Sequence, residues 1–130
     1  MAMDIVEAVE GYERWLAGHV RVDAGALERK HRRMVAGAFP FLRATFFRWP
    51  ELWARELPGE TSTRRVISVG DLHIENFGTW RDADGRLAWG INDFDEAHPL
   101  PWTSDLVRLA TSALLAIEEG HLQVEPGEAC

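Results

Sequence analysis

The sequence has little of what builds disulfides, thiolate metal clusters or basic surfaces. Cys130 is its single cysteine, which excludes an internal disulfide and a cysteine metal cluster. Lys30 is its single lysine and the formal net charge is -7 at pH 7, which argues against a protein that binds the nucleic-acid backbone. No apolar run approaches the roughly 20 residues of a transmembrane helix, and the acidic N-terminal segment is unlike a secretory signal. We therefore expect a cytoplasmic protein that binds neither nucleic acid nor membrane.

The composition is that of an ordinary soluble globular protein. Apolar residues make up 46% and charged residues 27% of the chain. The 130 residues suffice for one domain with its own core but not for two complete domains. Positive charge gathers in one short segment, which we interpret as the solvated face of a helix: Arg29, Lys30, Arg32 and Arg33 around His31.

Helices are predicted for the first sixty residues. Apolar positions recur at helical spacing over residues 5–16, with Asp4 as a candidate N-cap. A second helix is expected after Asp23, ending at a C-terminal cap on Gly37. The aromatic segment 38–59 predicts two short helices, whose Phe and Trp side chains we expect to fill a core.

The pattern changes to β-structure after residue 63. The β-branched run at 64–69 is typical of a buried strand. Two further strands, at 77–80 and 86–91, flank a turn rich in Asp and Gly and predict an antiparallel hairpin. Trp80 and Trp89 are expected to face each other across this hairpin.

A final helix completes the expected fold. It has Thr103 or Ser104 as its N-cap and an apolar face that runs from Leu106 to Ile117. We therefore expect an α+β protein in which helices pack around a short antiparallel hairpin. Its parts would be one domain with a helical region at 1–60, a catalytic hairpin at 64–98, a helix at 103–119 and a loose tail at 121–130.

Four polar side chains crowd the loop after the strand at 64–69: Asp71, His73, Glu75 and Asn76. Loops at strand ends are where a scaffold holds reactive groups. Asp71 and Asn76 lie five residues apart, as do Asp and Asn in the kinase catalytic loop H-R-D-L-x-x-x-N. In that loop the Asp orients the attacking hydroxyl and the Asn oxygen binds magnesium.

A second polar cluster ends the return strand of the hairpin: Asp93, Asp95, Glu96 and His98. Carboxylates this close repel one another unless a cation lies among them, and magnesium prefers hard oxygen ligands. Asp93 is followed by Phe94, as is the metal-binding Asp of the kinase D-F-G motif. Turn formation explains each of these residues taken singly, whereas the two loops together favour a catalytic metal site.

The motifs VGDLHIENFG, INDFDEAHPLPW and SDLVRLATSALLA resemble a bacterial family of unknown function related to aminoglycoside phosphotransferases and other protein-kinase-like enzymes. In the aminoglycoside enzymes H-G-D-x-H-x-x-N is followed by I-D-F or I-D-W, and then by a D-L pair that opens a helix. The resemblance covers about residues 27–116 and is most specific in the β-region. It implies part of a kinase-like catalytic lobe.

The resemblance also implies an activity and a set of residue roles. The activity would be transfer of a phosphoryl group from ATP or another nucleotide to an unknown acceptor, with Mg (or Mn) as cofactor. Asp71 would be the catalytic base, Asn76 and Asp93 metal ligands, and Asp105 a structural support of the loop. Further candidates are His73, Glu75 and Asp95 for loop bracing or a second metal, and Arg43 for a phosphate contact, although a guanidinium extending from a helix explains Arg43 equally well.

Two departures from the kinase-like pattern leave other functions open. Val69 replaces the histidine of the phosphotransferases, and no glycine-rich phosphate loop precedes a V-A-I-K strand. We therefore expect a partial kinase-like domain that is weak or inactive alone. One alternative is a metal-dependent phosphohydrolase. Another is a non-catalytic remnant that binds a metal or a partner, with a homo-oligomer or a missing lobe covering an exposed apolar patch.

Overall fold

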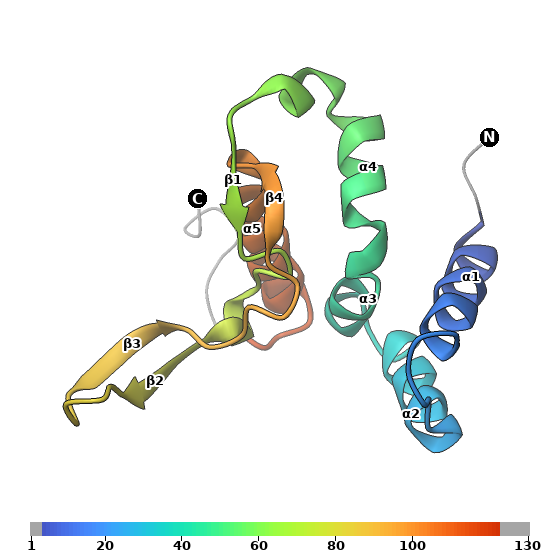
Figure 1. The fold of residues 1–130 in the computed structure, drawn as a ribbon, viewed down its shortest axis with the longest axis horizontal. Coiled ribbons are helices and arrows are strands. Elements are labelled where there is room, and N and C mark those ends of the chain that lie inside the picture. Colours follow the sequence, from blue (N-terminus) through green and yellow to red (C-terminus); the bar gives the residue numbers. More distant parts are fainter. Residues whose placement is uncertain (1–3, 123–130) are drawn as a thin grey trace. The chain divides into compact units, whose positions relative to one another are not determined.

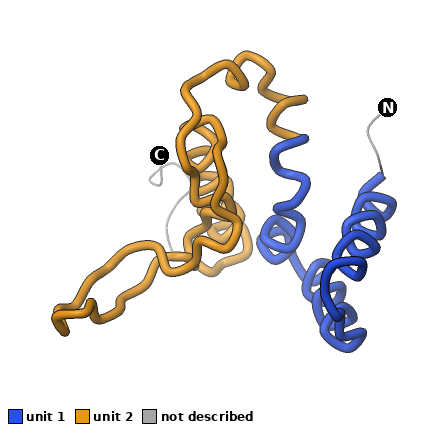
Figure 2. The backbone as a smooth tube through the Cα atoms, in the orientation of Figure 1, with its two compact units in different colours: residues 1–51 blue, residues 52–130 orange. Residues whose placement is uncertain are grey.

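The structure, a computed structural model, describes residues 4–122. The chain forms two compact units, Met1–Glu51 and Leu52–Cys130 (Figure 2). Most of the predicted tail, residues 123–130, lies outside the described part. Within residues 4–122, every helix is too short or too polar to cross a membrane.

The first unit is helical (Figure 1). The predicted helix at 5–16 is confirmed, and the aromatic segment forms two short α-helices joined by a 3-10 turn, as predicted. The last helix of the series starts in this unit and continues into the second. The elements are α1 (Ile5–Ala17), α2 (Ala24–Met34), α3 (Ala38–Ala44), η1 (Phe46–Arg48) and α4 (Trp49–Glu56).

Of the helix caps predicted for the first unit, Asp4 and Asp23 occupy the predicted N-cap positions, whereas the C-terminal cap at Gly37 is wrong. The Asp23 carboxylate accepts a hydrogen bond from the backbone N–H of Ala26 at 2.6 Å and so caps α2. Asp4 precedes α1 but makes no side-chain cap bond. Gly37 is extended, with φ of -177°, and is the residue before α3; α2 has already ended at Met34. The chain leaves α2 through an extended link instead of a left-handed cap.

The basic segment on α2 is mostly a solvated surface, as predicted. Arg32 makes an exposed ion pair with Glu28 one turn earlier on its own helix. Lys30 and His31 differ, because both contact one oxygen of the half-buried Glu13 on α1, at 3.2 and 2.8 Å. These two contacts join α1 to α2.

The second unit contains two separate two-stranded antiparallel sheets and one long helix (Figure 1). The predicted α+β class and the predicted hairpin are confirmed, with Gly85 at φ of 78° in the turn. The elements are η2 (Pro58–Ser62), β1 (Arg65–Ser68), η3 (Ile74–Asn76), β2 (Phe77–Arg81), β3 (Leu87–Ile91), β4 (His98–Pro101) and α5 (Thr103–Glu118).

Strand β1 was predicted to be buried, but most of it is exposed. Ile67 is 75% exposed, because in the described chain β1 pairs only with β4 and no second layer covers its outer face. Strand β4 was not predicted from the sequence, because Pro99 and Pro101 disfavour a strand. Both prolines pair with β1, Pro101 opposite Arg65 and Pro99 opposite Ile67.

The two hairpin tryptophans do not face each other. Trp80 is opposite Ala88 and Trp89 is opposite Thr79. Neighbouring residues of a strand point to opposite faces, so this offset of one residue separates the two indoles. Trp89 instead stacks on Phe77, with ring centroids 5.1 Å apart.

Helix α5 buries a different face from the predicted one. Leu106 is 54% exposed and Leu114 42% exposed. The predicted N-cap is also wrong, because Trp102 occupies that position and makes no side-chain cap bond. The buried side follows i, i+4 spacing and is largely polar: Ser104, Arg108, Ser112 and Ala116. Hydrogen bonds to the loop after β1, set out below, explain why this side faces inward.

Candidate functional site

A cavity of about 170 Å³ lies where the loop after β1 meets the loop after β3. Both loops lie in the second unit, at the base of the β2–β3 hairpin (Figure 1). The cavity brings together five residues that the sequence predicted for the site, from two segments about twenty residues apart. Its lining is Val69, Asp71, His73, Asn76, Asp93, Asp95 and Glu96.

Gly70 allows the two loops to approach each other. Its φ of 90° lies in the left-handed region that L side chains rarely adopt. A Cβ atom at this position would overlap the carbonyl oxygen of Glu96 and lie 2.9 Å from its carbonyl carbon. The Gly-Asp pair of the motif therefore has a steric basis, because Gly70 places Asp71 against the acidic loop.

Asn76 joins the two loops through its side-chain amide. Its Nδ2 donates to the backbone carbonyl of Asp93 at 3.0 Å, and its Oδ1 accepts the backbone N–H of Asp93 at 2.9 Å. The same Nδ2 lies 3.4 Å from the carbonyl oxygen of Asp71. The side chain is buried, so these bonds fix its orientation. An amide oxygen has two lone pairs, which leaves one for a further ligand.

Asp105, in the first turn of α5, supports the backbone of the loop. Its two carboxylate oxygens accept the backbone N–H groups of Val69 and Gly70, at 2.8 and 3.2 Å. Further along the helix, the hydroxyl of Ser112 accepts the N–H of Ile74 at 3.1 Å. Helix α5 thus holds the loop on both sides of Asp71.

Asp71 is paired with Arg108, a residue that was not predicted for the site. Arg108 donates from Nε at 3.0 Å and from Nη2 at 2.5 Å, both to Oδ1 of Asp71. Oδ2 lies 3.8 Å from Nε2 of the buried His73, beyond hydrogen-bond distance. The polar i, i+4 stripe on an otherwise apolar helix is the pattern that could have revealed Arg108.

The cavity concentrates negative charge. The pKa of Glu96 is raised above its ordinary 4.5, first by burial and then by the field of Asp71, with smaller effects from its acidic neighbours. Burial lowers the pKa of Arg108, while the bond and the charge of Asp71 oppose this shift. Four carboxylates thus lie within one small cavity, those of Asp71, Asp93, Asp95 and Glu96.

Besides the structural support Asp105, two predicted site residues lie outside the cavity lining. Glu75 is exposed in η3, and Arg43 is exposed on α3 of the first unit. Among residues 4–122, no three His, Cys, Asp or Glu side chains are placed to hold a metal ion. A cation at this site would therefore need the Asn76 oxygen, water or a ligand to complete its shell.

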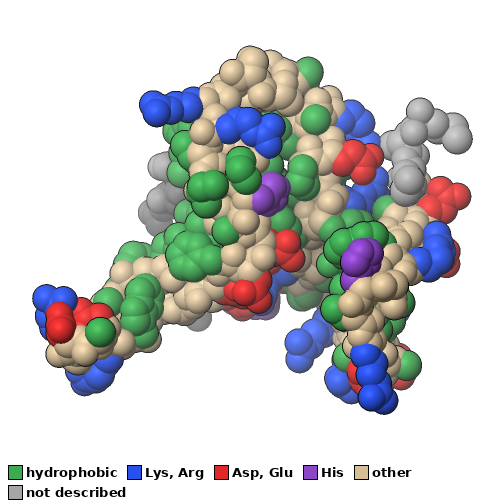
Figure 3. Space-filling model, viewed as in Figure 1, with side chains coloured by type: hydrophobic (Ala, Val, Ile, Leu, Met, Phe, Trp, Pro, Cys, Tyr) green, Lys and Arg blue, Asp and Glu red, His purple; other side chains and the backbone are tan. Residues whose placement is uncertain are grey.

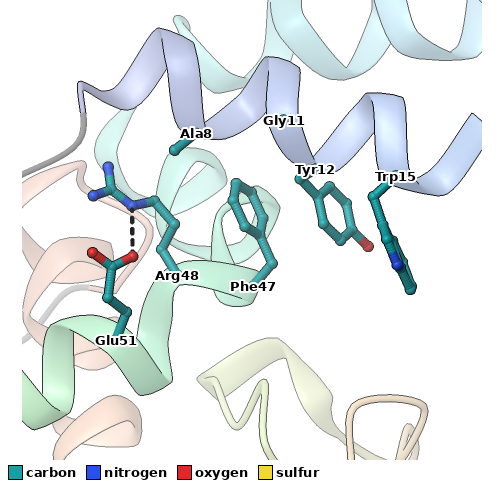
Figure 4. A pocket seen from close by; sticks show the side chains of 7 residues that line it. All are labelled: Ala8, Gly11, Tyr12, Trp15, Phe47, Arg48 and Glu51. Carbon is teal, nitrogen blue, oxygen red and sulfur yellow. Dashed lines mark ion pairs between the residues drawn. The ribbon is translucent and has the colours of Figure 1, made fainter.

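A second pocket, of about 480 Å³, lies within the first unit (Figure 4). The rings of Tyr12 and Phe47 stack with centroids 4.4 Å apart and 7° between their planes. Arg48 Nε lies 3.9 Å from a carboxylate oxygen of Glu51, and Figure 4 shows these two side chains facing each other. Packing between α1 and the η1–α4 segment accounts for this lining, which is Ala8, Gly11, Tyr12, Trp15, Phe47, Arg48 and Glu51.

The chain belongs to a bacterial protein family. A family model described as an uncharacterized protein conserved in bacteria (DUF2252) matches residues 21–128, which is most of the chain and includes both loops of the cavity. The predicted membership of a bacterial family of unknown function is therefore confirmed. Comparison with curated proteins and with solved structures gave no match. The relationship to aminoglycoside phosphotransferases stays a prediction.

Proposed function

We propose that the cavity is the catalytic cleft of a kinase-like phosphotransferase, which transfers a phosphoryl group from a nucleotide to a hydroxyl acceptor. One observation carries this proposal. Asp71 and Asn76 from one loop and Asp93 from another line a single cavity, and these residues have the spacing of the kinase catalytic and metal-binding loops. The Asn76 amide also ties the two loops together.

Asp71 is the residue that would orient the acceptor hydroxyl. Phosphoryl transfer passes through a loose transition state, so catalysis depends mostly on positioning and on neutralising charge. Asp71 needs to hold the hydroxyl in line and to accept its proton late in the reaction. Its carboxylate is fixed by Arg108 and lines the cavity, which supports the first of these two roles.

The donor atoms of the cavity fit magnesium, or manganese, bound together with a nucleotide. Asp93 has an exposed carboxylate and Asn76 a free lone pair on its amide oxygen, and these would hold the ion. Magnesium commonly takes one or two protein oxygens and completes its shell with water and phosphate oxygens. The ion would supply neutralisation of the phosphate charge. The absence of a closed cage of three acidic or histidine ligands among the described residues agrees with such an open site.

The transfer is expected to be slow for this chain. The sequence contains no glycine-rich loop and no V-A-I-K strand to hold the β- and γ-phosphates in line with the acceptor. A metal at Asn76 and Asp93 would still attract nucleotide phosphates. Nucleotide binding is therefore expected to be easier to detect than turnover.

Labelled ATP, magnesium and a panel of small hydroxylated acceptors test the proposal. Slow, ATP-dependent transfer is expected for the wild type and should be lost in Asp71→Asn. Glu75→Gln is the matched control, because Glu75 is an exposed acid outside the cavity lining. Equal loss in both variants would contradict the proposal. Phosphate release from a simple ester without ATP would instead indicate a metal-dependent phosphohydrolase.

A partner-binding role is a second candidate, favoured by the apolar surface of the second unit. Figure 3 shows hydrophobic side chains (green) on the surface, and Ile67, Trp102 and Leu106 are among the exposed ones. Isolated exposed apolar residues are ordinary, whereas a contiguous patch marks an interface. Light scattering across a concentration series tests this: a constant monomer mass, for the wild type and for Ile67→Lys, would contradict self-association.

A further inference from the structure

The buried side of α5 contains an arginine among small residues. Arg108 is 1% exposed and is flanked one turn away on each side by Ser104 and Ser112. Small side chains allow the loop after β1 to lie close against the helix. A guanidinium at such a depth is costly to bury unless a charged partner accepts its hydrogen bonds.

Arg108 differs from the other helix residues that hold this loop. Asp105 and Ser112 bond backbone N–H groups, and so fix the path of the chain before and after Asp71. Arg108 donates two hydrogen bonds to the side chain of Asp71. The hydrogen bonds that hold the loop backbone therefore do not depend on Arg108. The two hydrogen bonds that hold the Asp71 carboxylate both come from Arg108.

The two carboxylate oxygens of Asp71 have different surroundings. Nε and Nη2 of Arg108 both donate to Oδ1, and Arg108 does not line the cavity. Oδ2 is nearest to His73, which does line the cavity, but at 3.8 Å it accepts no bond from that ring. One oxygen is thus neutralised on the protein side, and the other is left for a ligand.

We propose that Arg108 is a positioning residue, which holds Oδ1 of Asp71 so that Oδ2 alone is presented to the acceptor hydroxyl. The inference rests on the proposed phosphotransferase function for its catalytic meaning, but its structural content stands apart from it. A second consequence concerns charge. Arg108 offsets one of the four carboxylates that line the cavity, which lowers their mutual repulsion before any cation binds.

The test uses Arg108→Met, which is apolar and similar in length, and Arg108→Lys, which keeps the charge but loses the paired donors. Ser112→Ala is the comparison variant on the same buried stripe: it removes the acceptor of the Ile74 N–H, so that amide should exchange faster, but it leaves the bonds between Arg108 and Asp71 in place. Three-bond couplings measured by NMR report the χ1 rotamer of Asp71, and hydrogen exchange reports the amides of Val69 and Ile74.

The wild type and Ser112→Ala should show one Asp71 rotamer. Arg108→Met should show several, with the Val69 and Ile74 amides still protected, and Arg108→Lys should be intermediate. Where transfer is measurable, kcat of Arg108→Met should fall about 100-fold, the scale of misplacing a catalytic group by an ångström. KM for the nucleotide should stay within about twofold, because the hydrogen bonds between Asn76 and Asp93, the proposed metal ligands, do not involve Arg108. Arg108→Lys should recover part of the rate.

Several outcomes would overturn the inference. A single Asp71 rotamer in Arg108→Met would do so, as would rotamer averaging that leaves kcat unchanged. Loss of protection at Val69 together with averaging would show that Arg108 supports the fold instead of positioning Asp71. If Arg108→Met does not fold, Arg108→Lys decides by the same two measurements. Absence of transfer in the wild type with every acceptor would count against the proposed function, while the rotamer result would still decide the role of Arg108.

Discussion

Replacing Gly70 by alanine should destabilise the second unit through two separate effects. The φ of 90° costs an alanine about 1–2 kcal/mol, because its Cβ crowds the backbone in the left-handed region. The new Cβ would also overlap the backbone of Glu96, and overpacking of this kind costs about 1–3 kcal/mol more. The backbone of Glu96 cannot rotate away as a flexible side chain would. The expected loss is therefore about 2–5 kcal/mol.

Gly85→Ala is the matched control for this variant. Gly85 has a similar φ of 78°, but a Cβ there would meet nothing within 4 Å. Gly85→Ala should therefore lower the free energy of unfolding only by the cost of the left-handed backbone, about 1–2 kcal/mol. Urea denaturation of both variants gives the comparison, with the free energy of unfolding taken from the midpoint and slope. Equal losses at the two glycines would refute the argument that close approach of the loops requires Gly70.

Three further predictions concern stability. Gly11→Ala, inside α1 where the new Cβ meets only the end of an arginine side chain at 3.9 Å, should stabilise by about 0.5–1 kcal/mol; a thermal melt that shows destabilisation would contradict this. Asp105→Ala should leave two loop N–H groups without their acceptor and cost about 2–5 kcal/mol, with faster exchange of those amides. Burial raises the pKa of Glu13, but hydrogen bonds from His31 and Lys30 outweigh burial and hold this pKa below 4.5. The contribution of Glu13 to stability is therefore present above about pH 4.5 and is lost as the pH falls through the folded-state pKa. Glu13→Gln should reduce this loss of stability on acidification, measured as the free energy of unfolding against pH, and an unchanged pH dependence would contradict the assignment.

The local features of the site could be predicted from the sequence because they depend on short-range chemistry. The Asp-rich turn with Gly85 determines the hairpin, and the spacing of Asp71 and Asn76 follows from one loop. The meeting of Asp93 with this loop also followed, because a hairpin returns the chain to its starting point. These predictions required no knowledge of the rest of the core.

The features that depend on long-range packing were missed. Strand β4 contains two prolines and is a strand only because β1 lies beside it. The buried side of α5 was predicted from hydrophobicity. The side that faces inward is instead determined by hydrogen bonds with the loop, which Asp105 and Ser112 accept and Arg108 donates. Periodicity reports apolar burial alone, so a helix that buries a polar stripe is assigned the wrong face.

The central claim is that the cavity binds a metal–nucleotide complex through Asp93. Calorimetric titration with magnesium–ATP tests this claim most directly. The variants are Asp93→Asn and Asp95→Asn. Asp93 Oδ1 accepts the backbone N–H of Asp95 at 3.0 Å, and the Asn amide oxygen can still accept this bond, so the loop should keep its conformation. We expect binding by the wild type, a loss of at least about tenfold, or 1.4 kcal/mol, in Asp93→Asn, and a loss within about threefold in Asp95→Asn. Equal losses in the two variants, or no binding by the wild type, would contradict the account.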